Sequence, residues 1–527
     1  MPLPQSDPKA VWPPANLTPI LAKMGQWSAW YSGDLEKLQA AYGGGTTADS
    51  TGFFASDKGG IRATVGRTLQ RFFVGQPTVG PERNTKLPVP IASEMCQVSA
   101  DLLFADPVTI IIDDDDTQER VNELADDNLH ATLAEAAEVC AALGGVYLRV
   151  TWDTSVMPDG PFLTSIDADT AIPEFKWGRL VAVTFWSVVS TVGKLTYRHL
   201  ERHELDGTGV GVIRHGLYEG TNDTLGIRVS LTTLPETAPL AASIDLNDEG
   251  TISTLSPGLA VVYVPNQTPN RSWRTDPIGR NLGRSDLDGV EHLMDQLAEV
   301  MTAWVRAIRL AKARIFIAKS LLNTAGPGQG VIGNLEQEAY TALPGSLAGK
   351  DTPMSDSIEY VQAKVEYEQY QATAETLIEQ ILQMAGYSMQ TFGVGDTGTV
   401  RTATEIESKE RRSLMTRSRK IREWRPQLEV LLTKLLDVDN ALFSAHNVTT
   451  DLAVEFTDGV QETQLALAQT VQALYTAESA SVHERVTILH PDFDEDDVAT
   501  EVARIKEEFG HPMPSPQMSP FDPDPAE

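Results

Sequence analysis

The sequence predicts an α+β fold that is predominantly helical and is divided among several domains. Three observations lead to this prediction. The chain has 527 residues, of which 41% are hydrophobic and 22% are charged, so it can fill more than one core. On both sides of the middle, apolar residues recur at helical spacing. Between about residues 146 and 283, segments are instead rich in β-branched and aromatic residues, several of them with a period of two.

The N-terminal part is expected to be helical up to a pair of glycines. A helix is predicted over residues 17–42, and a link rich in Gly, Ser and Thr follows to about Gly60. The last helix of this part should end at Gly144 and Gly145, because glycine readily adopts the left-handed conformation that closes a helix. The other expected helices are 61–74, 90–105 and 117–143.

Five segments in the middle of the chain have the composition of strands. They are VYLRVTW (146–152), LVAVTFWSVV (180–189), LTYRHLERHEL (195–205), VGVIRHGLY (210–218) and LAVVYV (259–264). Asp206-Gly207-Thr208-Gly209 lies between two of them and predicts a hairpin turn. A mixed α and β region is therefore expected to extend to about Gly283.

Two long helices are predicted after this region. Ser285 with Asp288 fits a capping box, and apolar residues then continue at helical spacing to about Lys312. Such a helix is roughly 40 Å long at 1.5 Å per residue. An insertion rich in Gly and Pro follows over 313–364, and a second helix is expected over about Val365 to Ala385.

Beyond a glycine-rich loop, the C-terminal part is expected to be helical again. Thr402 and Glu405 form a second capping box before a helix that runs to about Phe443. Pro426 lies inside this helix and should kink it. The stretch DLAVEF (451–456) predicts one returning strand. Two helices and a disordered Pro-rich tail complete the chain: Asp458 (with Gln461 as a cap) to about Glu478, about Asp494 to Phe509, and 511–527.

Charge and cysteine content limit the possible environments of the protein. The net charge of −31 opposes general adhesion to nucleic acid, because contacts to phosphate require Lys and Arg. It is compatible with a conduit along which DNA passes without sticking. Cys96 and Cys140 are expected to be buried thiols in a reducing compartment. The sequence shows no secretory leader and no run of about 18 apolar residues, so neither secretion nor a membrane span is expected.

Two glycine-rich loops have part of a phosphate-binding pattern but lack its essential residues. Gly393 to Gly398 has the G-x-x-x-x-G spacing, yet Thr399 and Val400 stand where Lys and a hydroxyl residue are required. Gly345 to Asp351 is one residue short and ends in a carboxylate. Since no strand pattern precedes either loop, neither predicts an NTPase.

Acidic and histidine clusters also have simple interpretations. Asp113–Asp116 lacks the spacing and the Gly turn of a calcium loop, so a solvated cap before a helix is expected. His199, His203 and His215 lie on adjacent predicted strands, with His199 and His203 on one face. Zinc binding is conceivable, but no Cys joins them, and surface or satisfied histidines are favoured. The sequence therefore predicts no enzyme and no cofactor.

One segment departs from the acidic character of the chain. Between Arg401 and Lys434 there are ten Lys and Arg against five Asp and Glu. One interpretation is a helix with a solvated polar face and pairs such as Glu407 with Arg411. The other is contact with an acidic partner, either DNA or the surface of a neighbouring subunit.

The order of these parts resembles the portal proteins of tailed bacteriophages over about residues 17–510. An α and β region precedes a long helix, a small insertion, a second long helix, a glycine-rich loop, a kinked basic helix and C-terminal helices. Short stretches of the sequence are also similar to those of portals from phages infecting actinobacteria. These stretches are SADLLFADPVTI (99–110), RHLERHE (198–204), AGYSMQTFG (385–393) and TATEIESKERRSLMTRSRKIREW (402–424).

The resemblance implies a portal fold assembled as a ring, commonly of twelve subunits, at one vertex of the capsid. The implied segments are a wing (1–284), stem helices (285–312 and 365–387), a clip (313–364), a tunnel loop (388–402), a kinked basic helix with a strand that completes the wing sheet (403–457), a crown (458–510) and the tail (511–527). The ring would be a virion component that is assembled in the host cytoplasm.

The implied function is a channel for packaging and ejecting double-stranded DNA without sequence specificity. The implied partners are further copies of the chain, the major capsid protein, the terminase large subunit and the head-to-tail adaptor, with no membrane. The residues that would face DNA in the tunnel loop are Val394, Gly395, Asp396, Thr397, Gly398, Thr399 and Val400. The residues that would lie near DNA or at a subunit interface are Arg401, Lys409, Arg411, Arg412, Arg417, Arg419 and Lys420.

Three other interpretations compete with this one. Another head-to-tail connector or adaptor is a structural rival, although adaptors are usually much shorter. A packaging ATPase would need intact Walker motifs, which are missing here. A scaffold protein unrelated to viruses is compatible with the physical features alone.

Overall fold

The computed structural model describes most of the chain and divides it into two compact units. The larger unit comprises residues 1–400 and 406–457, and the smaller one comprises 401–405 and 458–527. The described residues are 3–4, 7–34, 36–38, 89–126, 128–243, 251–311, 314–318, 340–343, 358–361, 365–393, 403–448, 452–457, 464–477, 479–490 and 495–509. Several predictions lie outside them: the helix at 61–74, the loop at 345–351, the caps at Thr402 and Asp458, and the tail.

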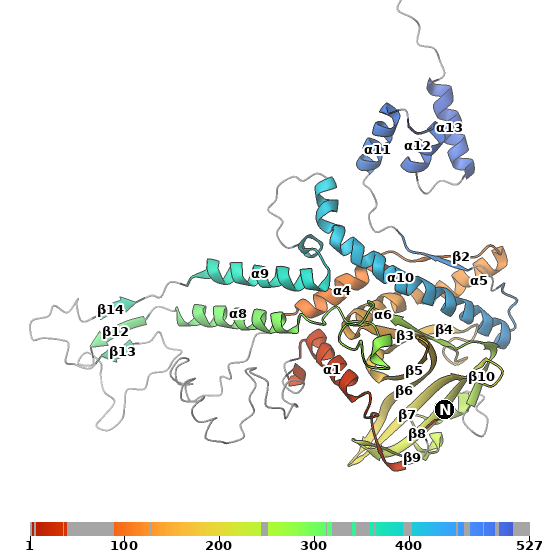
Figure 1. Cartoon of the computed structure of the whole chain (residues 1–527), viewed down its shortest axis with the longest axis horizontal. Coiled ribbons are helices and arrows are strands. Elements are labelled where there is room, and N and C mark those ends of the chain that lie inside the picture. The colour runs from red at the N-terminus through yellow and green to blue at the C-terminus, as the bar shows by residue number, and fades with distance from the viewer. Residues whose placement is uncertain are drawn as a thin grey trace, which may run out of the picture. The chain divides into compact units, whose positions relative to one another are not determined.

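The N-terminal part of the larger unit is helical over most of its described residues (Figure 1). Its described helices are α1 (Thr18–Ser32), α4 (Ile91–Phe104), α5 (Asp115–Asp126) and α6 (Leu129–Leu143). The prediction of α4 is confirmed, whereas the helix predicted over 17–42 ends at Ser32, where Gly33 adopts a φ of 63°. The single helix predicted over 117–143 is wrong. Asn128 interrupts it with a φ of 72°, a left-handed conformation that Asn tolerates better than most residues.

The start of α5 and the end of α6 follow the sequence signals. Asp114 precedes α5, and its carboxylate accepts hydrogen bonds from the backbone N–H of Thr117 at 3.0 Å and from its hydroxyl at 2.6 Å. This confirms the acidic cap. Gly144 ends α6 with a φ of 87°, as predicted. Its Cα also faces a neighbouring segment so closely that an added Cβ would lie 2.8 Å from the carbonyl oxygen of Gly283.

The described strands form one large antiparallel sheet and smaller ones. The large sheet has seven strands in the order β1-β9-β8-β7-β6-β5, and β10 also pairs with β8. A second sheet has the order β11-β3-β4. All five predicted strands are confirmed, as β3, β6, β7, β8 and β11. The bounds are β1 Asp7–Val11, β3 Gly145–Thr151, β4 Phe162–Asp167, β5 Ala171–Lys176, β6 Arg179–Val192, β7 Leu195–Leu205, β8 Val210–Thr221, β9 Thr224–Val229, β10 Thr251–Pro257 and β11 Val261–Pro265, with the short helix α7 at Ala238–Ser243.

The hairpin turn between β7 and β8 forms as the sequence predicts. One carboxylate oxygen of Asp206 accepts hydrogen bonds from the backbone N–H groups of Thr208 at 2.8 Å and Val210 at 2.9 Å. Gly209 adopts a φ of 90°. The aspartate side chain therefore closes the turn.

Two long helices lie side by side beyond the sheets (Figure 1). They are α8 (Glu291–Leu310) and α9 (Tyr367–Ala385). The rings of Trp304 on α8 and Tyr370 on α9 are nearly parallel, with centroids 6.2 Å apart. The capping box at Ser285 is wrong, because α8 begins only at Glu291. The Ser285 hydroxyl instead donates to the carbonyl of Ala142 at 2.6 Å.

Between α8 and α9 the structure has strands that the sequence analysis did not predict. β12 (Arg314–Ala318) pairs in parallel with β13 (Tyr340–Leu343) and antiparallel with β14 (Ile358–Val361). Their sequences are short and are separated by long stretches of Gly, Pro and polar residues. Local patterns therefore gave no reason to expect a sheet in this insertion.

The longest described helix, α10, crosses the larger unit. It spans Ala403–Leu442 and continues through Pro426; the expected kink stays a prediction. The rings of Phe104 and Trp424 pack edge to face, with centroids 5.0 Å apart. β15 (Ala453–Glu455) confirms the returning strand. It pairs with β2 (Thr109–Ile111) in a separate two-stranded sheet, so it does not complete the large sheet as the resemblance implied.

The smaller unit contains three described helices: α11 (Gln464–Thr476), α12 (Val482–Leu489) and α13 (Glu495–Phe509). Val486, Val498 and Val502 form its hydrophobic cluster. α12 was missed by the sequence analysis, although its start carries a signal. The Ser481 hydroxyl accepts a hydrogen bond from the backbone N–H of Glu484 at 3.1 Å, and Ser-x-x-Glu is the sequence of a capping box.

The close approach at Gly144 yields a first testable prediction. We expect Gly144→Ala to destabilise the larger unit by about 1–3 kcal/mol, because the methyl group meets a carbonyl oxygen and the φ is strained for alanine. Gly25→Ala is the matched control, since a Cβ there meets nothing within 4 Å. In helix α1 that change should be neutral or stabilising by up to about 1 kcal/mol. Thermal denaturation measures both; equal Tm values for the two variants would contradict the role of Gly144.

Candidate functional site at the junction of the long helices

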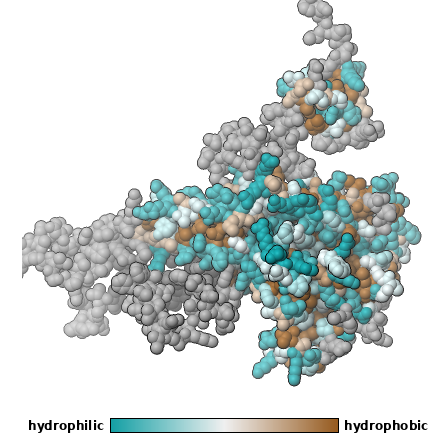
Figure 2. Space-filling view, in the orientation of Figure 1, coloured by the Kyte–Doolittle hydropathy of each residue, from teal (hydrophilic) through white to brown (hydrophobic). Residues whose placement is uncertain are grey.

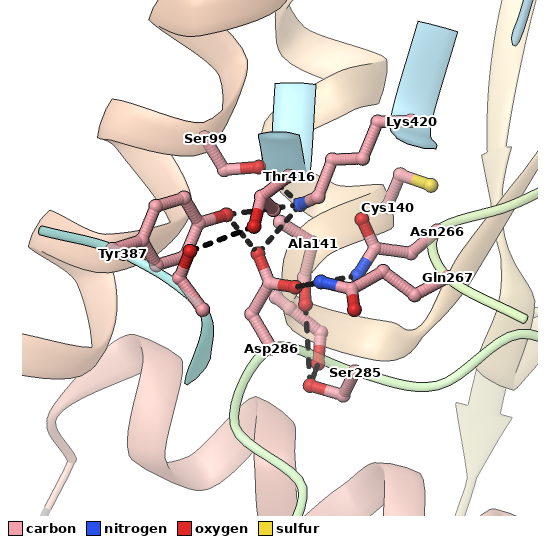
Figure 3. A network of polar contacts seen from close by, with 12 residues as sticks. Ser99, Cys140, Ala141, Asn266, Gln267, Ser285, Asp286, Tyr387, Thr416 and Lys420 are labelled. Carbon is pink, nitrogen blue, oxygen red and sulfur yellow. Dashed lines mark hydrogen bonds and ion pairs between the residues drawn. The ribbon is translucent and has the colours of Figure 1, made fainter. Parts of the chain in front are cut away.

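A lysine from α10 is buried where the long helices meet the rest of the larger unit (Figure 3). Lys420 is only 1% exposed. Its ammonium donates to the Asp286 carboxylate at 2.6 Å, to the Tyr387 hydroxyl at 3.1 Å and to the Ser99 hydroxyl. An ammonium has three protons, so all of its donors find acceptors inside the protein.

The partner carboxylate is equally well satisfied. One oxygen of Asp286 accepts from the Lys420 ammonium and from the Tyr387 hydroxyl at 2.6 Å. The other accepts from the side-chain amides of Asn266 and Gln267, both at 2.8 Å. These contacts offset the cost of removing the ion pair from water. Asp286 precedes α8, Tyr387 follows α9, Ser99 lies on α4 and Asn266 follows β11, so the network joins five segments.

Burial also determines the chemistry of the neighbouring groups. It raises the pKa of the Tyr387 hydroxyl far above its usual range, and the adjacent Asp286 carboxylate adds to that effect. Burial likewise raises the pKa of the thiols of Cys96 and Cys140. Both cysteines are free and buried, which confirms the prediction of buried thiols. A thiol in such surroundings is a poor nucleophile.

The chain that leads from α9 toward the predicted tunnel loop is anchored on α10. The Thr416 hydroxyl donates to the carbonyl of Gly386 at 2.7 Å. The Ser413 hydroxyl accepts from the backbone N–H of Ser388 at 2.9 Å and lies 2.8 Å from the Thr391 hydroxyl. These bonds hold the 3-10 turn Met389–Phe392 against α10. The loop residues themselves, Val394, Gly395, Asp396, Thr397, Gly398, Thr399 and Val400, lie outside the described residues.

The structure separates the basic residues of α10 into different groups. Lys420 contradicts the expectation of contact with DNA or a neighbouring subunit, because its charge is buried and fully used within the chain. Arg417 donates to the carbonyls of Leu102 at 2.6 Å and Thr457, and so it also binds within the larger unit.

The remaining residues of that prediction keep their proposed role. Arg411 and Arg419 are exposed, and so is Arg412, although it also donates to the carbonyl of Gln383. Arg401 and the side chain of Lys409 lie outside the described part of the chain. The expected contacts of the exposed arginines stay a prediction.

The sequence contained a signal for the buried lysine that the charge count obscured. Trp424, Leu428 and Leu431 are buried and lie four, eight and eleven residues after Lys420. These spacings place all of them on one face of a helix. Lys420 therefore lies on the apolar stripe of α10. No pattern in the sequence indicated its partners Asp286 and Tyr387, which are distant along the chain.

The three histidines meet on one face of the large sheet. The rings of His199 and His215 stack with centroids 5.3 Å apart, and their nitrogens approach to 3.2 Å. His203 lies 2.7 Å from the Glu201 carboxylate, which also binds Arg149. Two of the three histidines are therefore buried and the third is half-buried, rather than on the surface. Across the described residues, no group of His, Cys, Asp or Glu is arranged to hold a metal ion.

We expect the Lys420→Met change to destabilise the protein by about 3–5 kcal/mol, because it leaves the Asp286 carboxylate buried without a counter-charge. The double variant Lys420→Met, Asp286→Asn should lose less than the sum of the two single changes, since neither charge remains. Lys194→Met, at an exposed position, serves as the control and should be nearly neutral. Chemical denaturation gives the free energies; additive losses would contradict a coupled pair.

A third prediction concerns pH. Burial lowers the pKa of His215 from 6.5 to about 4, against an opposing effect of Glu201. Between these pH values the unfolded chain binds a proton that the folded chain does not, so stability falls as the pH is lowered. His215→Gln should reduce the loss of stability between pH 7 and 4.5 by about 2 kcal/mol.

The control for this prediction is His446→Gln, since His446 is exposed. Thermal denaturation across the pH range should give the wild-type slope for this control. An unchanged slope in His215→Gln as well would show that His215 does not contribute to the acid sensitivity.

Comparison with known proteins links this architecture to one family. A family model described as phage portal protein, SPP1 Gp6-like, matches residues 80–510. Among curated proteins, none matches the chain. Three solved structures of gene transfer agent (GTA) particles have similar chains at 14% identity. The neck of the native particle gives a TM-score of 0.37 over 81% of this chain and 98% of that chain. The neck of the empty particle gives 0.36 over 79% and 95%, and the native virion gives 0.35 over 80% and 98%.

Proposed function

Because the chain belongs to the SPP1 Gp6-like family of phage portal proteins, we propose that it forms the ring through which double-stranded DNA enters and leaves a phage capsid. Portal proteins are structural components of the virion at the connection between head and tail, and they are not enzymes. The family match therefore confirms the predicted function class and the prediction that the chain is not an enzyme. The closer resemblance to portals of phages infecting actinobacteria stays a prediction.

The hairpin of α8 and α9 is the observation that best supports a ring. Ile308, Tyr367 and Met384 on these helices are each more than half exposed, at 54%, 54% and 57%. Figure 2 shows hydrophobic residues between hydrophilic ones along this hairpin. Two helices alone cannot cover apolar side chains on all sides, whereas neighbouring hairpins in a closed ring can do so. We propose a ring of twelve copies, as the family resemblance implies.

The parts of the chain have proposed roles within that ring. Residues 1–284 form the wing, α8 and α9 form the stem, and the insertion with β12, β13 and β14 forms the clip. The clip docks the terminase large subunit and later the head-to-tail adaptor. The smaller unit with α11, α12 and α13 forms the crown, and the wing contacts the major capsid protein. Support for these roles comes from the order of the elements, which matches the order that the resemblance implies.

DNA passes through the proposed channel without sequence-specific contacts. The tunnel loop 388–402 would lie at its narrowest part, and its beginning, including the turn Met389–Phe392, is held on α10 by Ser413. A net charge of −31 disfavours tight binding of DNA along the channel. A different head-to-tail connector is the alternative, and the family match over residues 80–510 favours the portal.

Negative-stain electron microscopy of the purified chain tests this proposal. We expect closed rings with a central hole, and native mass spectrometry should give their subunit number. Chains that remain monomeric over the concentration range of the experiment would overturn the ring.

Trp304→Ala tests the contribution of the stem helices. The change removes the ring that stacks on Tyr370 and should weaken the α8–α9 contact by about 2 kcal/mol. Rings should then be lost or become heterogeneous in size. Tyr475→Ala is the control, because this exposed side chain lies in the smaller unit. Closed rings of unchanged size in Trp304→Ala would contradict a packed stem.

A further inference from the structure

One face of α10 carries arginines that form no ion pair among the described residues. Arg411, Arg419, Arg422 and Arg425 are exposed. At about 100° per residue they fall within an arc of roughly 120°, and they are called the basic face below. Met415 lies within the same arc and is 52% exposed. The opposite side of α10, with Lys420 and Trp424, is buried.

Arginine and methionine are enriched in protein–protein interfaces relative to the rest of protein surfaces. An exposed methionine in the middle of an arginine face therefore favours a protein partner. A DNA backbone offers phosphates to the arginines but nothing for the thioether. The chain as a whole also carries a charge of −31, which repels DNA.

The complementary charge is found on α5 and the residue before its cap. Asp113, Asp115, Asp116 and Glu119 are exposed, and they are called the acidic face below. The nearby cation, Arg120, does not neutralise them, because its guanidinium binds Asp439 at 3.0 Å and Glu123 at 2.9 Å. The acidic face therefore has negative charge available for a partner.

The fold holds these two faces apart within one chain. The contact of Arg120 with Asp439 fixes α5 near the C-terminal end of α10. Asp439 lies 14 residues beyond Arg425, the nearest arginine of the basic face, which corresponds to roughly 21 Å along a helix. That separation exceeds the Debye length of about 8–10 Å at physiological salt. Neither face can satisfy the other in the same molecule.

We propose that the basic face of α10 binds the acidic face of α5 on a neighbouring copy of this chain. Each copy presents both faces at different places, so the contact is head-to-tail and can repeat around a closed ring. The interface rests on the ring proposed above and identifies the charged surfaces that assemble it. The test has to distinguish this contact between copies from binding of DNA to the basic face.

Charge exchange between the two faces tests the proposal. One variant carries Arg419→Glu, Arg422→Glu and Arg425→Glu. The other carries Asp115→Lys, Asp116→Lys and Glu119→Lys. Each variant alone places like charges opposite one another and should lose ring formation in negative-stain images. An equal mixture should recover rings, because alternating copies restore opposite charges at every contact.

The control variant reverses three arginine charges elsewhere: Arg271→Glu, Arg274→Glu and Arg280→Glu. These arginines are exposed, and the variant should leave rings intact. Circular dichroism establishes that each variant is folded. A chain that combines both charge reversals should form rings again, and this second rescue would support the interface.

Normal rings in the wild-type chain and in both single-face variants would overturn the interface but not the ring. A failure of the wild-type chain to form rings would overturn both. Normal rings with lost DNA binding in the arginine variant would assign the basic face to DNA and overturn the interface.

Discussion

The buried ion pair between Lys420 and Asp286 is the constraint on which the arrangement of the larger unit depends. A buried ammonium needs acceptors for its protons, and a buried carboxylate needs donors at both oxygens. Groups from α4, from the segment after β11 and from the segment after α9 meet these needs. None of these segments can move away without leaving a polar group or a charge unsatisfied. The network therefore holds α10 in one position against the segment before α8 and the segment after α9.

This constraint suits a protein whose function is mechanical. A portal has to hold its helices in place while DNA moves past them, and it supplies no chemistry of its own. The turn at Met389–Phe392 shows the same principle on a smaller scale, since hydrogen bonds with Ser413 and Thr416 hold it and the residues just before it on α10. Charges that are buried and paired stabilise the subunit. Charges that remain exposed on helix faces are free to act between subunits, where their attraction depends on salt.

Elements that depend on local signals were predictable. The stop of α6 at Gly144 follows from the conformational freedom of glycine, and the five strands follow from their β-branched and aromatic residues, several of them with a period of two. Elements that depend on distant partners were not. β12, β13 and β14 are four or five residues each, and such short segments form a sheet only through pairing with one another. The start of α8 at Glu291 was misplaced because Ser285 uses its hydroxyl to bind the end of α6 rather than to cap a helix.

The sequence by itself determined the mixed α and β character and the order of the long helices, because helical and strand periodicities and turn residues act over short distances along the chain. Its short characteristic stretches and the order of its parts indicated the family. It also determined that the segment from Arg401 to Lys434 is basic. Only the tertiary structure decided what each of those charges does. Lys420 is buried beside Asp286, whereas Arg419, its neighbour in the chain, is exposed. A helix turns by about 100° per residue, so adjacent cations face different surroundings, and those surroundings exist only after distant segments have packed.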